Sequence, residues 1–277
     1  MDSPNMRRIV ILGKTGAGKS SLGNTIFGKE QFTVCYDSVS AVNPCQAKTQ
    51  SLNGIETTLI DTPGFFDTNK PEEKWKAEIV KCITECSPGP HAFLIVLKVE
   101  KFTDQENDVI NKITQYFSEE VFRFSTVVFT HGDDLQDGQE IKDFVRPNSF
   151  LNDVVKKCGG RYHVIDNKRW KNPSAETYRT NAYQVNEIFK SVEEIVNDNN
   201  GNCYTNEFLQ TVEKMTQQTE KSIAQSENMS KEEIRQKAKS RFCDALNKTA
   251  GMTTGVLLGA FFGATVSAVV VTSGVIM

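Results

Sequence analysis

Short runs of apolar, often β-branched residues recur through the N-terminal part of the chain, separated by polar turns and helical stripes. Continuous runs of this kind are typical of parallel strands that are covered on both faces of a sheet. They predict strands at residues 9–12, 55–60, 92–97, 125–129 and 161–165.

The intervals between these runs carry apolar residues at the three- and four-residue spacing of a helix face. Leu22 and Ile26 share one face of a helix that begins at residue 19, and Gly28 is placed to end it. Further stripes predict helices at residues 72–86, 103–117 and 185–196. Residues 31–50, by contrast, are polar and aperiodic, so we expect an irregular loop there.

The C-terminal part of the chain changes character twice. After a break at 197–202, residues 205–248 are polar and helical in pattern, with a second helix start at the capping box of Ser230 and Glu233. Residues 249–277 then form a run of 29 residues without a charge. A bilayer-spanning helix needs about 20 apolar residues, so this run predicts a transmembrane anchor.

The flanks of the uncharged run indicate its orientation. Lys237, Lys239, Arg241 and Lys248 precede it, and the positive-inside rule then keeps the rest of the chain on the cytosolic face of an intracellular membrane. Glycines recur every four residues from 251 to 263, a spacing that can bring two membrane helices together. The alternatives are an apolar helix folded back into a soluble core, or an interfacial hairpin bent at the glycines.

Composition narrows the possible functions. The net charge is −3 with both signs mixed along the chain, which argues against a nucleic-acid surface. Seven scattered cysteines lack the paired spacing of a zinc site, so we interpret them as reduced, mostly packing residues. The N-terminus has no apolar signal region, and Asp2 stands where myristoylation requires glycine.

A glycine-rich turn joins the first predicted strand to the first predicted helix. Gly13, Gly18, Lys19 and Ser20 have the GxxxxGKS spacing of a P-loop. Backbone N–H groups and the helix dipole converge on phosphate at such a junction. Lys19 is expected to reach the β- and γ-phosphates and the Ser20 hydroxyl to bind Mg²⁺, so that both stabilise the phosphoryl oxygens. The turn therefore predicts a nucleoside triphosphate site.

The second predicted strand runs directly into the sequence DTPG at 61–64. Asp61, at the C-terminal end of a strand beside the P-loop, can hold Mg²⁺, and Gly64 can offer an N–H to a γ-phosphate. Phe65 follows, where Ras-type proteins have the glutamine that orients the attacking water. Fast unaided hydrolysis is therefore not expected. For the first switch loop, Ser38, Ser40 and Thr49 all offer hydroxyls, and spacing does not choose among them.

The fourth predicted strand delivers THGD at 130–133, which bears on the choice of base. Guanine presents N1–H and an exocyclic amine side by side, and the Asp133 carboxylate can accept both. Adenine cannot satisfy it, because adenine N1 is an acceptor. His131 stands where a lysine is usual, and its flat ring could cover the base. Asp134 is an adjacent competitor, and an Asp-rich turn is the plain alternative.

In this order, GKTGAGKS, DTPGFFD, FTHGDD and IDNK resemble the motifs of the GIMAP family, the GTPases of immunity-associated proteins. Residues 89–106, GPHAFLIVLKVEKFTDQE, are similar to the family's own box between its third and fourth GTP motifs. The resemblance covers 7–198. It implies an α/β, Ras-like P-loop GTPase domain there, with a mostly parallel sheet and helices on both faces. A helical extension at 199–248 and the hydrophobic tail at 249–277 would follow.

The resemblance also implies the ligands and their contacts: GTP or GDP, Mg²⁺, and nucleotide-dependent self-association. Ser20 and Asp61 would be the metal ligands, and Val42-Asn43-Pro44 in place of the family's threonine leaves Ser40 as its substitute. The implied nucleotide-binding set is Gly13, Lys14, Thr15, Gly16, Ala17, Gly18, Lys19, Ser20, Ser21, Ser40, Asp61, Gly64, His131, Asp133 and Asn167.

Two functions fit these observations. The first is a membrane-anchored GTP switch that hydrolyses GTP slowly or with help from a partner subunit, which could supply an arginine finger. The second is a scaffold without hydrolysis, in which GTP orders the switch loops and drives oligomerisation on a membrane. A third reading, an ATPase, conflicts with the carboxylate at Asp133.

Overall fold

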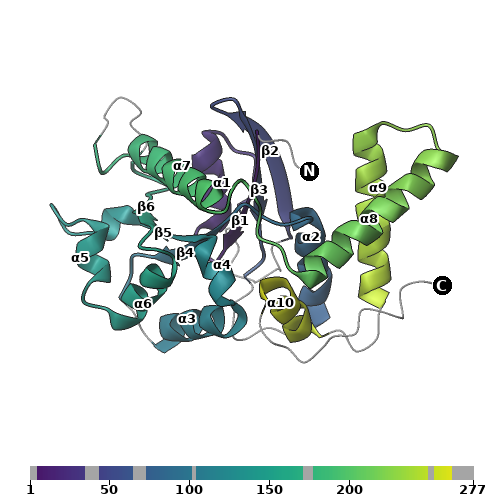
Figure 1. Cartoon of the computed structure of the whole chain (residues 1–277). Coiled ribbons are helices and arrows are strands. Elements are labelled where there is room, and N and C mark those ends of the chain that lie inside the picture. The colour runs from purple at the N-terminus through teal and green to yellow at the C-terminus, as the bar shows by residue number, and fades with distance from the viewer. Residues whose placement is uncertain are drawn as a thin grey trace.

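The computed structural model describes residues 5–34, 44–64, 73–101, 104–170, 177–248 and 253–263. Its centre is a six-stranded sheet with the order β2-β3-β1-β4-β5-β6 (Figure 1). The strands are β1 Met6–Leu12, β2 Gln46–Leu52, β3 Ile55–Asp61, β4 Ala92–Lys98, β5 Ser125–Thr130 and β6 Tyr162–Val164. All neighbours are parallel except β2 and β3.

The five predicted strands are confirmed, and β2 is an addition to them. It occupies part of the interval that the sequence predicts to be an irregular loop. β2 lies at the edge of the sheet, and none of its residues is buried. An exposed edge strand needs no apolar face, so its polar sequence QAKTQSL carries no strand signal.

Helices cover both faces of the sheet. Figure 1 shows α1 and α7 on one side, and α3, α6 and α10 on the other. The first seven helices are α1 Lys19–Phe27, α2 Glu73–Cys86, α3 Asp104–Tyr116, α4 Glu119–Arg123, α5 Ile141–Val145, α6 Ser149–Lys157 and α7 Asn181–Asp198. A bidentate ion pair from Arg7 in β1 to Glu193 in α7, at 2.8 and 2.7 Å, joins sheet and helix. The predicted α/β, Ras-like architecture is confirmed.

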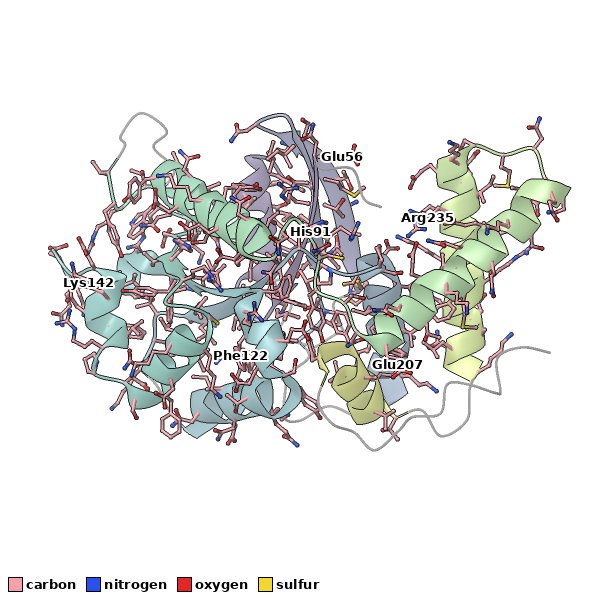
Figure 2. All side chains as sticks on the ribbon, viewed as in Figure 1. Glu56, His91, Phe122, Lys142, Glu207 and Arg235 are labelled. Atoms are coloured by element: carbon pink, nitrogen blue, oxygen red, sulfur yellow. The ribbon has the colours of Figure 1, made fainter. Side chains whose placement is uncertain are left out.

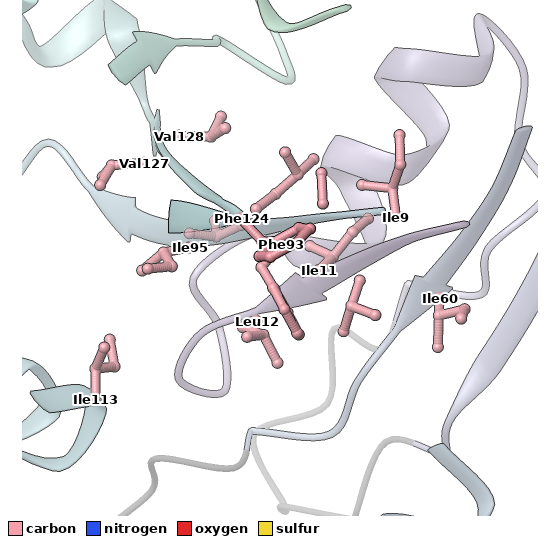
Figure 3. Packing of buried hydrophobic residues seen from close by; sticks show 14 of the residues in the cluster. Ile9, Ile11, Leu12, Ile60, Phe93, Ile95, Ile113, Phe124, Val127 and Val128 are labelled. Atoms are coloured by element: carbon pink, nitrogen blue, oxygen red, sulfur yellow. The ribbon is translucent and has the colours of Figure 1, made fainter. Parts of the chain in front are cut away.

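The core is built on the central strand β4, in which Ala92 to Val96 are fully buried. Figure 3 shows Phe93 among side chains of the neighbouring strands. Burial of each large apolar side chain contributes about 1.5–3 kcal/mol to folding, so this strand anchors the whole sheet. The strand register brings the C-terminal ends of β1, β3, β4 and β5 to one edge, where the predicted chemical residues follow.

Two helices after the sheet form an antiparallel hairpin, α8 Glu207–Ser226 and α9 Lys231–Lys248. Arg235, labelled in Figure 2, joins them through ion pairs to Glu213 (3.0 Å) and Glu220 (2.7 Å). The hairpin rests on α2, where Lys239 pairs with Glu85 at 2.7 Å. The predicted capping box at the start of α9 is present, with Ser230 and Glu233 bonded to each other in both directions.

The last described helix, α10 Thr254–Phe262, falls inside the predicted membrane anchor at 249–277. Leu257, Leu258, Phe261 and Phe262 are buried, and α10 packs against α2, α3 and α8. For these residues the structure matches the alternative of an apolar helix folded back onto the protein. Gly263 ends the helix in the left-handed region, at φ 73°. None of the described helices is both long and apolar enough to cross a membrane.

Candidate functional site

The turn between β1 and α1 wraps closely against the sheet. A Cβ on Gly13 would lie 2.5 Å from the backbone oxygen of Val96 in β4, so only glycine fits there. Gly16 and Gly18 both adopt left-handed backbone conformations, at φ 77° and 88°. These glycines allow the backbone to turn its N–H groups inward at the start of α1, the geometry that holds a phosphate.

Three polar side chains converge at this turn. Lys19 is buried, and its Nζ donates to the backbone oxygen of Lys14 at 3.0 Å. The Ser20 hydroxyl donates to Asp61 Oδ2 at 2.5 Å. Because Asp61 ends β3, directly beside β1, the sheet itself brings this carboxyl to the P-loop.

The second carboxyl oxygen of Asp61, Oδ1, is the feature of the site that most directly indicates a bound cation. Asp61 is only 2% exposed, and its Oδ1 is buried without a hydrogen-bond partner. Burial raises the pKa of this carboxyl, while Lys19 and the Ser20 hydrogen bond oppose the rise. A buried carboxylate oxygen without a donor, beside a serine hydroxyl, fits a hard cation with oxygen ligands such as Mg²⁺.

The residues after Asp61 are held against the P-loop strand. The Thr62 hydroxyl donates to the backbone oxygen of Ile11 at 2.7 Å, and Gly64 is buried. Phe65 and Ser40 lie outside the described residues. Thr49, an alternative to Ser40, is in β2, and its hydroxyl lies 2.8 Å from that of Thr58. In the structure, Thr49 therefore pairs with a neighbouring strand at the edge of the sheet.

The segment after β5 is tied to the P-loop from the opposite side. The Thr130 hydroxyl donates to the backbone oxygen of Ala17 at 2.8 Å. His131 adopts a left-handed conformation (φ 61°), and its Nδ1 lies 3.1 Å from the Thr130 hydroxyl. A Cβ on Gly132 would lie 2.7 Å from the ring of Trp170, which packs over this turn. The predicted base-binding turn thus has a fixed position relative to the phosphate turn.

Asp133 points into a charged cluster. Its Oδ2 pairs with Arg169 at 2.9 Å, and its backbone N–H donates to Asp166 at 3.3 Å. A hydrogen bond with the Asp166 side chain, together with burial, raises the pKa of Asp133. Burial alone would raise the pKa of Asp166, but hydrogen bonds from Asp133 and from the backbone of Arg169 and Lys168 lower it. Asp166 therefore fixes the backbone of Lys168 and Arg169, whereas Asp133 pairs with the exposed side chain of Arg169, which a ligand can replace.

Asn167 links the base side of the site to α1. Its Oδ1 accepts from the Thr25 hydroxyl at 2.8 Å, and its Nδ2 donates to the backbone oxygen of Gly18 at 3.5 Å. Beside it, a cavity of about 830 Å³ opens between α1 and the segment 28–34. Its lining includes Ser21, Thr25, Asn167 and Trp170. A volume of this size can take much of a small-molecule ligand.

The structure brings several of the predicted residues into contact. Ser20 bonds to Asp61, Asn167 to Gly18, and Lys19 to the backbone of Lys14. Ala17 accepts a bond from Thr130, the residue before His131. Lys14 faces outward to Glu100, at 3.0 Å, and Thr15 is exposed. The sequence analysis missed the bond from Thr25 to Asn167, the pairing of Arg169 with Asp133, and Trp170. All three contacts join segments that are distant in the chain.

The AIG1 family model matches residues 7–226. Immune-associated nucleotide-binding protein 5 of Arabidopsis thaliana is 32% identical over 92% of this chain and 84% of its own length. GTPase IMAP family member 8 of Homo sapiens is 32% identical over 72% of this chain and 29% of its own length. Immune-associated nucleotide-binding protein 10 of A. thaliana is 30% identical over 84% of this chain. This chain spans only about half of that last relative.

Solved structures of Toc33 from A. thaliana share the fold. A dimerization-deficient mutant superposes with a TM-score of 0.54 at 17% identity, over 70% of this chain and 85% of that chain. The complex with GDP and Mg²⁺ superposes with a TM-score of 0.53 at 19% identity, with the same coverage. Likeness at this identity concerns the fold. The structural likeness shows the fold of a Ras-like P-loop GTPase domain, and the family model and the relatives show that the chain belongs to the AIG1 family.

Proposed function

We propose that this protein is a guanine-nucleotide switch that binds GTP and GDP with Mg²⁺. The observation that carries the proposal is the unpartnered Asp61 Oδ1, buried beside Ser20 and Lys19 at the P-loop. Such a buried acceptor costs about 1–3 kcal/mol unless a donor or cation satisfies it, so the site is suited to a charged ligand.

Ser20 and Asp61 would hold the metal ion, which would neutralise charge on the β- and γ-phosphoryl oxygens. Lys19 would exchange its bond with the Lys14 carbonyl for a phosphate oxygen, without a change of backbone. The buried Gly64 follows the end of β3 by three residues and would offer its N–H to the γ-phosphate. These residues together would distinguish GTP from GDP.

Asp133 would select the base by accepting the N1–H and amine of guanine. Asp133 is paired with Arg169, whose side chain is 74% exposed. Because an exposed ion pair contributes little free energy, the base can displace Arg169 at a small cost in binding free energy. Asn167 and His131 would border the base, since both are already fixed against the P-loop or Thr130. Base recognition and phosphate binding would therefore be coupled through Gly18 and Ala17.

We propose that GTP hydrolysis is slow in the isolated chain and assisted by a partner subunit. Phe65 occupies the position of the water-orienting glutamine, so Lys19 and Ser20 would act without a local group for the water. For the fold relatives atToc33 and psToc159, dimerization is described as important for GTPase activity. The alternative is a non-hydrolysing scaffold that oligomerises when GTP is bound.

Attachment to the cytosolic face of an intracellular membrane is the second part of the proposal. Its support is the uncharged run 249–277 and the basic residues that precede it. Because α10 lies within this run and is packed on the protein, attachment requires a change in this helix.

The nucleotide proposal is tested with Asp61→Asn. Wild-type protein should bind a fluorescent GTP analogue about tenfold or more tightly with Mg²⁺ than with EDTA, a difference of about 1.4 kcal/mol or more. Asp61→Asn should lose this difference, because the amide cannot serve as an anionic metal ligand. Asp134→Asn, an exposed neighbour of the base motif, is the control and should keep it. Equal Mg²⁺ dependence in Asp61→Asn and wild type would contradict the site.

A further inference from the structure

We infer that α10 is a stowed membrane-binding helix, held by a receptor on the protein in competition with a lipid bilayer. The receptor consists of residues of the GTPase domain and of the segment before α8, namely Phe93, Phe117, Ser118, Tyr204 and Asn206. The inference rests on the membrane attachment proposed above and adds the element that controls it. A helix of about 20 residues drawn from the run 249–277 must include residues 258–262. These residues are the buried end of α10, so docking and insertion cannot occur together.

The receptor binds the C-terminal end of α10 through hydrogen bonds. The Asn206 Nδ2 donates to the backbone oxygens of Ala260 (2.9 Å) and Phe261 (3.1 Å). The Tyr204 hydroxyl also donates to the backbone oxygen of Phe261, at 3.3 Å. The backbone N–H of Ser118 donates to the backbone oxygen of Phe262, at 3.0 Å. The last four carbonyls of a helix have no partner within it, and here the receptor supplies donors to three of them.

The apolar part of the receptor is aromatic. Phe262 lies 4.5 Å from Phe117 and 6.1 Å from Phe93, measured between ring centroids. Phe261 lies 6.3 Å from Phe93, which Tyr204 also contacts at 5.6 Å. Since a bilayer would also remove these side chains of α10 from water, the apolar burial of the helix is similar in both states. Release of α10 would expose the aromatic surface that it covers on the protein, so this surface and its ring contacts favour the docked state.

Release would not leave the helix end unsatisfied. In the docked state Gly263 takes a left-handed conformation that ends α10. If the helix continued through Gly263 in a bilayer, the same three carbonyls would bond to N–H groups one turn further on. The two states therefore exchange one set of hydrogen bonds for another. Besides these contacts, α10 packs against α2 and α3.

The first test uses Asn206→Asp in the full chain. Aspartate keeps the N-terminal cap that Asn206 Oδ1 gives to Leu209 in α8, but it loses the donors to α10 and turns a carboxylate toward its carbonyls. Flotation with neutral phosphatidylcholine vesicles should then increase about tenfold over wild type, the effect of one to two hydrogen bonds. Asn148→Asp, the same change at the cap of α6, is the matched control and should leave flotation unchanged.

The second test locks the helix in place. A Cβ on Gly263 would lie 3.4 Å from the Cβ of Ser118, near the separation found in disulfides. Because the left-handed backbone of Gly263 strains any side chain there, the reduced double variant and the single Gly263→Cys variant measure the effect of that strain on flotation. Ser118→Cys combined with Gly263→Cys should therefore form a cross-link, verified by mass spectrometry. The oxidised protein should lose vesicle flotation, and reduction should restore it. Each single variant and oxidised wild type serve as controls for the native cysteines.

The outcomes separate the inference from the proposed function. If wild type, Asn206→Asp and the oxidised cross-linked protein all float with the vesicles to the same extent, the stowed helix is overturned and membrane attachment stands. If Asn206→Asp binds GTP normally but does not float, the lipid assignment and membrane attachment both fall, and the nucleotide switch remains. Dimerisation of Asn206→Asp without flotation would assign the released helix to a second copy, and would equally overturn the inference.

Discussion

His163 illustrates how burial of a single residue sets a pH dependence away from the nucleotide site. It lies in β6 under α7, and its Nε2 is 2.9 Å from the hydroxyl of Ser191. Burial lowers the pKa of His163 to about 4, against a small opposing effect of Glu187. Between this value and the unfolded value near 6.5, the unfolded chain binds a proton that the folded chain does not.

Stability should therefore fall as the pH drops through this window. Between pH 7.5 and pH 5 the loss due to His163 should be about 2 kcal/mol, and it should be absent in His163→Gln. Urea unfolding at the two pH values measures the difference. His131→Gln leaves His163 in place and should show the same loss as wild type. A full loss in His163→Gln would mean that another group is responsible.

At the same scale, the sequence predicted residues whose chemistry is carried by a local motif. Lys19 and Ser20 follow from the P-loop spacing, and Asp61 from its place after a strand. The contacts of Asp133 with Arg169, and of Asn167 with Thr25, could not be predicted in this way. These contacts join loops or helices that come together only when the sheet folds, so the spacing of apolar residues along the sequence does not predict them.

Among the elements, buried strands were predictable because both of their faces are apolar, as β4 shows. The edge strand β2 was missed because none of its residues is buried. The tail was harder, since an apolar helix has the same sequence whether it is covered by lipid or by protein. What places α10 on the domain is a set of distant polar partners, Asn206, Tyr204 and Ser118.

Arg235 joins the two helices of the α8–α9 hairpin by ion pairs to Glu213 and Glu220. Arg235→Ala should lower the free energy of unfolding by about 1–3 kcal/mol, because Glu213 and Glu220 both lose a charged partner. Thermal or urea unfolding monitored by circular dichroism measures the change. Lys190→Ala, which removes an exposed ion pair with Glu187, should stay within about 0.5 kcal/mol of wild type. Equal effects would contradict a special role for Arg235.

On the scale of the whole molecule, the sheet gathers the phosphate, metal and base residues at one edge, and the C-terminal helices pack around α2. Phe65 stands where Ras-type proteins have the water-orienting glutamine, so we propose that a second subunit supplies this group. Single-turnover hydrolysis of GTP should accordingly speed up as protein concentration rises, because completion of such a site in trans can raise rates by about 10³–10⁵.

Lys19→Met is the control for this experiment and should show no turnover, since it loses the phosphate-binding cation. A rate that does not change with concentration would mean that each chain is a complete catalyst. Absence of turnover at every concentration would favour the scaffold alternative, in which bound GTP only orders the switch loops.

The central claim, a guanine-nucleotide site read by Asp133, is tested most directly by competition binding of GTP and XTP to wild type and Asp133→Asn. Wild type should prefer GTP by about 10²-fold, because the carboxylate accepts both guanine donors. Asp133→Asn should prefer XTP, since its amide can donate to the xanthine carbonyl and accept from N1–H. Asp134→Asn should keep the preference for GTP. An unchanged preference for GTP in Asp133→Asn would contradict the account.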